Sequence, residues 1–204
     1  MDRLWRPFFL LAGVLILIGG PLHPNGTMAE MLAHPDWVLS HALMTVGFVA
    51  LGMGLALYRR AAHVAGRTAR WSRIALYATI LQAIEMALHT ASTVDHANLV
   101  AGRATPVLSA HLTLTVVVYP LFAAAIIAWI VAATRDRALG SKWIAWIGIV
   151  GAAAHGLAAL LVLVLGIGQA VFLFPMIVLL ALWLILVAAW PLGETRSTPA
   201  VGTV

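Results

Sequence analysis

The chain has 204 residues, of which 63% are hydrophobic and 9% are charged, and its formal net charge is +5. Soluble domains carry roughly 25% charged residues, so this composition excludes an ordinary soluble protein and indicates a polytopic membrane protein. Cysteine is absent, which excludes a disulfide framework, a thiolate metal site and a cysteine nucleophile.

Six apolar segments approach the roughly 20 residues that a helix needs to cross the bilayer core. In chain order they cover residues 7–22, 37–58, 74–92, 107–134, 143–165 and 170–190. The connection at 166–169 is so short that the last two segments must form an antiparallel hairpin. We therefore expect an all-α integral membrane protein, with a single six-transmembrane-helix bundle over residues 1–192 and a polar cytoplasmic tail over residues 193–204.

The basic residues predict the orientation, because cytoplasmic loops retain the positive charge. Eleven of the twelve Lys and Arg residues fall on one side of the predicted bundle, and only Arg103 falls on the other. Both termini are therefore expected in the cytoplasm. The basic residues form short clusters between apolar runs, so the lipid bilayer and not nucleic acid is the expected partner. A single lysine among many Ala, Leu and Arg residues is typical of a GC-rich bacterial genome and favours a bacterial plasma membrane.

The third apolar segment contains a polar stripe. Its members recur in steps of three and four residues, so they share one helix face: Gln82, Glu85, His89, Ser92 and His96. A carboxylate and an imidazole at membrane depth are costly without partners, and such residues are functional-site candidates by default. The stripe is expected to face protein or water.

Three other spans each carry one histidine: His41, His111 and His155. At about 1.5 Å per residue, His41, His89 and His111 lie within about two turns of the outer interface, whereas His155 lies near the midplane. A lone transmembrane histidine is often only an interhelical hydrogen-bond donor that contributes about 1 kcal/mol. The histidines of the outer loops, such as His23, are expected to be solvated.

The first functional hypothesis is haem b held between histidines of two helices, because haem iron accepts imidazole ligands and helix bundles present them from facing helices. The candidate ligands are His41, His89, His111 and His155, and Arg103 is a candidate partner of a propionate. Histidines on four successive spans resemble the pattern of the four-helix membrane cytochromes b that bind two haems. The resemblance implies electron transfer. This chain has no span histidine in the inner half, so at most one haem is expected.

The second hypothesis is a metal ion without porphyrin. The candidate ligands are His41, Glu85, His89 and His111, a set of imidazoles and one carboxylate that suits copper, iron or zinc. No HxxH, HxxxH or HExxH motif occurs, so binding is favoured over metal-dependent hydrolysis. Oxidoreductase activity is left open.

Two further interpretations need no cofactor. Glu85 and the histidines can serve a proton-coupled small-solute transporter. Alternatively, the protein can be an accessory subunit whose polar residues hold helices together or dock onto a larger complex. The preferred expectation is a redox-cofactor or metal-binding protein with its site in the outer half of the bilayer. Such a protein would act as an electron-transfer subunit that serves a quinone or a redox partner.

Overall fold

The computed structural model describes residues 3–61 and 64–190. The long helices are α1 (Trp5–Gly19), α3 (Asp36–Tyr58), α4 (Gly66–Ala91), α6 (Pro106–Arg135), α7 (Lys142–Ala159) and α8 (Ile177–Ala189). Shorter helical pieces are α2 (Met28–Ala33), a 3-10 turn over Ser92–Asp95, α5 (His96–Val100), a π-helical turn over Leu160–Val164 and a 3-10 segment over Gly168–Met176. The described residues contain no strand, so the prediction of an all-α membrane bundle is confirmed.

Within the described residues, five helical stretches are long and apolar enough to cross a membrane. Helix α1 has 15 residues, which corresponds to about 22 Å and is shorter than a bilayer core of about 30 Å. A membrane crossing by α1, and with it the count of six spans, therefore stays a prediction. The expected cytoplasmic tail lies outside the described residues.

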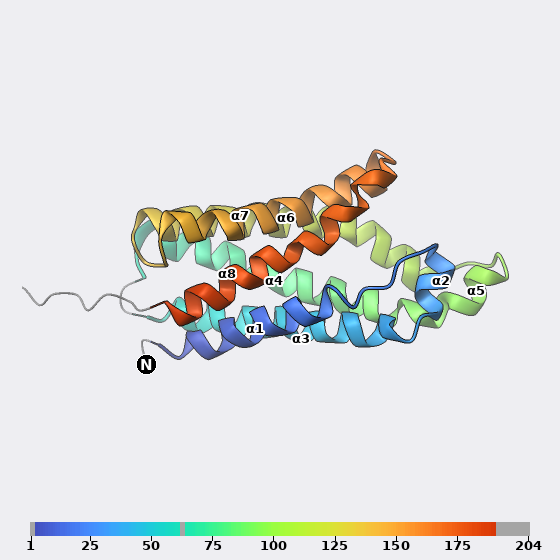
Figure 1. Ribbon diagram of the computed structural model, residues 1–204, viewed down its shortest axis with the longest axis horizontal. Coiled ribbons are helices and arrows are strands. Elements are labelled where there is room, and N and C mark those ends of the chain that lie inside the picture. The colour runs from blue at the N-terminus through green and yellow to red at the C-terminus, as the bar shows by residue number, and fades with distance from the viewer. Residues whose placement is uncertain (1–2, 62–63, 191–204) are drawn as a thin grey trace, which may run out of the picture.

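The six long helices form a closed ring in chain order. Helix α1 packs against α3, α3 against α4, α4 against α6, α6 against α7, α7 against α8, and α8 returns to α1 (Figure 1). Small residues allow the closest approaches, as membrane helices commonly require. At Gly151 of α7, even a Cβ atom would collide with the backbone at Leu180 of α8.

The ring has two chemically different ends. Helix α1 begins and α8 ends at one of them, where the Arg6 guanidinium donates a hydrogen bond of 2.8 Å from Nη2 to the carbonyl oxygen of Trp190. Helices α2 and α5 cover the opposite end (Figure 1). Arg103 follows α5 at that opposite end, and the basic residues between α3 and α4 and between α6 and α7 lie at the first end. This arrangement agrees with the charge pattern from which the orientation is predicted.

The two prolines inside apolar segments have different effects. Pro120 lies within α6, and the α-helix continues past it from Pro106 to Arg135. Pro175 lies in the 3-10 segment, and the regular α-helix α8 begins two residues later at Ile177. The last apolar segment is therefore interrupted at the end of the bundle that α2 and α5 cover, as expected where a proline removes a backbone donor.

Candidate metal centre

Imidazoles from three neighbouring helices meet inside the bundle near the end that α2 and α5 cover. His41 lies near the start of α3, His89 near the end of α4 and His111 near the start of α6. Antiparallel packing of successive helices brings these three helix ends to the same level. His41 and His111 are buried, and His89 is partly buried.

A fourth histidine joins them from the connection between α1 and α2. His23 is partly buried, and its ring centroid lies 4.8 Å from that of His41 and 6.0 Å from that of His89. The His41 and His89 centroids are 4.0 Å apart, and the His89 and His111 rings stack at 3.8 Å. The four rings thus form a continuous row, which we call the histidine row (His23, His41, His89 and His111), running from the loop into the bundle.

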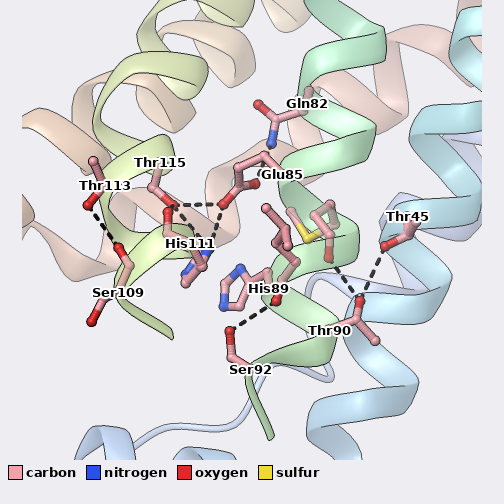
Figure 2. A network of polar contacts seen from close by, with 12 residues as sticks. Thr45, Gln82, Glu85, His89, Thr90, Ser92, Ser109, His111, Thr113 and Thr115 are labelled. Atoms are coloured by element: carbon pink, nitrogen blue, oxygen red, sulfur yellow. Dashed lines mark hydrogen bonds and ion pairs between the residues drawn. The ribbon is translucent and has the colours of Figure 1, made fainter. Parts of the chain in front are cut away.

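Glu85 lies at the inner end of this row and accepts several hydrogen bonds (Figure 2). Its Oε1 atom lies 2.6 Å from Nδ1 of His111 and accepts a bond of 2.7 Å from the Thr115 hydroxyl. The Gln82 amide donates to Oε2 over a longer distance of 3.3 Å. The carboxylate is fully buried, so these donors supply the partners that a buried acidic group requires. The Tyr119 side chain of α6 also interacts with Glu85 and Gln82.

Backbone carbonyl groups determine the tautomer of two of the rings, that is, which ring nitrogen carries the proton. Nδ1 of His41 lies 2.6 Å from the carbonyl oxygen of Trp37, and Nδ1 of His23 lies 2.8 Å from that of Pro24. A carbonyl oxygen can only accept, so Nδ1 carries the proton in both rings. In the neutral ring the lone pair is then on Nε2, the arrangement found in metal-binding histidines whose other nitrogen donates to a carbonyl or carboxylate.

Two nitrogens of the row are buried without a hydrogen-bond partner in the described part of the chain. They are Nε2 of His41 and Nδ1 of His89. A buried polar atom left unpaired costs free energy, so a bound metal ion at these nitrogens would stabilise the protein. Burial also lowers the pKa of His23, at the loop end of the row, and this favours the neutral imidazole that binds metal ions.

The side chains that could bind a metal ion form two groups, each compact enough to surround one ion. The outer triad is His23, His41 and His89, and the inner triad is Glu85, His89 and His111; within each, one potential ligand atom from every residue lies within 4.8 Å of those of the other two. Coordination by imidazole nitrogen and carboxylate oxygen requires metal–ligand bonds of roughly 2.0–2.2 Å, so only small side-chain adjustments separate either triad from a closed site. His89 belongs to both.

The structure brings together four of the residues that the sequence singles out, and it separates two. His41, Glu85, His89 and His111 meet as described. His155 instead stacks on Tyr119 of α6, with ring centroids 4.1 Å apart, and neither of its nitrogens has a partner among the described residues. Arg103 is exposed and donates from Nε to the side-chain oxygen of Asn98 over 3.1 Å.

Sequence reasoning does not include His23 in the site, since a loop histidine is expected to be solvated. The available signal is local: His23 lies between Pro21 and Pro24, only a few residues after α1 ends. Proline restricts both its own backbone and that of the preceding residue, so this short loop has few conformations. Its position keeps the imidazole against the end of the bundle.

Comparisons of the chain with models of known protein families, with curated proteins and with solved structures give no match.

Proposed function

We propose that this protein binds a transition-metal ion within the membrane bundle, through the histidine row and Glu85. The observation that carries the proposal is the pair of buried nitrogens, Nε2 of His41 and Nδ1 of His89, that have no hydrogen-bond partner among the described residues. Both belong to rings that contact further potential ligands, and the tautomer of His41 is already fixed by the Trp37 carbonyl. A bound ion would satisfy these atoms and offset the cost of burying them.

The ligand types narrow the choice of metal. Neutral imidazole suits copper, zinc and iron, and the chain has no thiolate to offer. Affinity of such nitrogen and oxygen sites generally increases toward Cu²⁺ and is lower for Zn²⁺. We therefore propose that Cu²⁺ or Zn²⁺ is the metal ion that the site binds most tightly. With copper or iron the site can also exchange electrons with a quinone or a partner subunit.

The ring geometry favours a metal ion over haem b. Two axial imidazoles bind haem from opposite faces, so the macrocycle must lie between them. The His89 ring is instead in direct contact with its neighbours, with centroids 4.0 Å from His41 and 3.8 Å from His111. Haem ligation by either adjacent pair would require the two rings to separate, whereas a single ion requires only that their nitrogens turn toward it.

The test is elemental analysis and an absorption spectrum of protein purified in detergent, first as isolated and then after chelation and titration with Cu²⁺ and Zn²⁺. We expect at least one tightly bound ion per chain and no Soret band. His41→Ala should lower the affinity strongly, because a fixed buried ligand is lost.

Two matched controls accompany this test. His155→Ala removes another imidazole within the spans, and His34→Ala removes an exposed one that pairs with Asp36 over 3.7 Å; both variants should bind like the unmodified chain. A protein that binds neither ion, or whose His41 variant binds as tightly as the His155 variant, would refute the proposal. A Soret band that shifts on reduction would support haem instead.

A further inference from the structure

We infer that the site holds two metal ions, one in the outer triad and one in the inner triad, with the His89 imidazole as the bridge between them. This inference rests on the proposed function. It assigns to the protein a dinuclear centre whose ions differ in their ligands. The outer ion would have three imidazoles, and the inner ion would have two imidazoles and a carboxylate.

The position of His89 carries the inference. Its ring lies between those of His41 and His111, in contact with both, and it is the one residue common to the two triads. An imidazole has two nitrogens on opposite edges of the ring, and each can bind one ion. Nδ1 of His89 is buried without a partner among the described residues, so no protein hydrogen bond has to be broken before it binds.

The number of donors also exceeds what one ion uses. Zinc and copper sites built from histidine are typically four-coordinate, whereas five side chains gather here: His23, His41, Glu85, His89 and His111. An assignment of one His89 nitrogen to each triad divides the six donor atoms evenly into three and three. Three protein ligands leave a position open for water or another small ligand, as in sites that react and not only stabilise a fold.

Bridging has a definite proton balance. A neutral imidazole carries one N–H proton, and binding an ion at that nitrogen forms the metal–nitrogen bond and releases the proton to water. Two adjacent cations stabilise the resulting anionic ring, because a bound metal ion is the dominant local charge and favours the deprotonated ligand. The Glu85 carboxylate, as a ligand of the inner ion, adds further negative charge to balance the two ions. Binding of the second ion should therefore release one more proton than ligation by neutral rings alone.

The experiment is a titration of the chelated full-length protein in detergent with Cu²⁺, followed by elemental analysis and by electron paramagnetic resonance with double integration. We expect two copper ions per chain. Because a bridging imidazolate couples the two unpaired electrons antiferromagnetically, the integrated signal at low temperature should fall well below two spins. The unmodified chain thus provides the decisive measurement, whatever the folding behaviour of variants.

Variants then assign the two positions. His23→Ala removes a ligand of the outer triad alone, so it should bind one copper with a full one-spin signal. His155→Ala should keep two coupled ions, since its imidazole belongs to neither triad. Each variant is compared with the unmodified chain by circular dichroism and size-exclusion chromatography before titration.

The outcomes separate this inference from the proposed function. One copper per chain in the unmodified protein overturns the dinuclear centre and leaves metal binding intact. Two coppers whose signal integrates to two spins overturn the bridge through His89. No bound copper or zinc overturns both.

Discussion

His111 and Glu85 are joined across two helices, with Nδ1 of the imidazole 2.6 Å from Oε1 of the carboxylate. Thr115, one turn along α6 from His111, donates its hydroxyl to the same oxygen over 2.7 Å. The carboxylate therefore receives both contacts from α6 at one atom, and the His111 ring is held in one orientation. Carboxylate–histidine pairs of this kind fix the ring of a metal ligand and raise its basicity.

Thr115→Val should weaken metal binding although Thr115 is not a proposed ligand. Valine has nearly the same shape and cannot donate to Glu85, so the carboxylate loses a donor in a buried site. Loss of such a partner behind a ligand typically lowers metal affinity by 10- to 100-fold, and we expect a loss of at least about 10-fold. The measurement is competitive titration of Zn²⁺ against a chromophoric chelator.

The matched control for this prediction is Thr113→Val. Thr113 is on the same helix, is exposed, and donates to the carbonyl of Ser109 in its own helix over 2.8 Å. Its substitution should leave the affinity unchanged. Equal effects of the two variants would mean that the hydroxyl near Glu85 has no specific role.

Glu85→Gln should distinguish a metal site from a haem site. The amide keeps the size of the side chain and removes the negative charge, so the inner triad loses its only anionic donor. We expect metal affinity to decrease by about 10- to 100-fold, which is the typical loss when a group that supports a metal site is removed. Haem bound through imidazoles alone would keep its stoichiometry. Elemental analysis and the absorption spectrum of the same sample give both readouts.

Much of the architecture can be predicted from the hydropathy and the helical periodicity of the sequence. Apolar runs of about 20 residues predict membrane helices, and a spacing of four residues places Glu85 and His89 on one face of α4 whatever surrounds it. The requirement that buried ionisable groups face protein then favours their meeting with His41 and His111. These inferences need no knowledge of tertiary contacts.

The sequence does not determine the rotation of one helix relative to the next. His155 is predicted to lie deeper than the other span histidines, but its contact with Tyr119 depends on how α7 is rotated. Close packing fixes that rotation, since Gly151 contacts α8 and Gly156 contacts α6. His23 lies in a loop without any periodic pattern, so its contact with His41 becomes visible only once α1 and α3 are packed. Both differences arise from packing between helices.

Gly151→Ala should destabilise the bundle. A Cβ atom at Gly151 would collide with the backbone of α8 at Leu180, which cannot move as a flexible side chain can. Overpacking of this kind typically costs about 1–3 kcal/mol, measured as the free energy of unfolding in mixed micelles. Gly168→Ala is the control, because a Cβ atom there has no neighbouring atom of the described residues within 4 Å; a loss of stability as large as that of Gly151→Ala would contradict the packing argument.

The orientation of the bundle can be tested with single cysteines, because the chain has none of its own. Ala65 and Ala101 are both exposed and lie at opposite ends of the stretch that contains α4 and α5. Since basic loops stay in the cytoplasm, Ala101→Cys should react with a membrane-impermeant thiol reagent in intact cells. Ala65→Cys should react only after permeabilisation. Labelling of Ala65→Cys alone in intact cells would show the opposite orientation, with the metal centre near the cytoplasm, and labelling of both from one side would show that α4 does not cross the membrane.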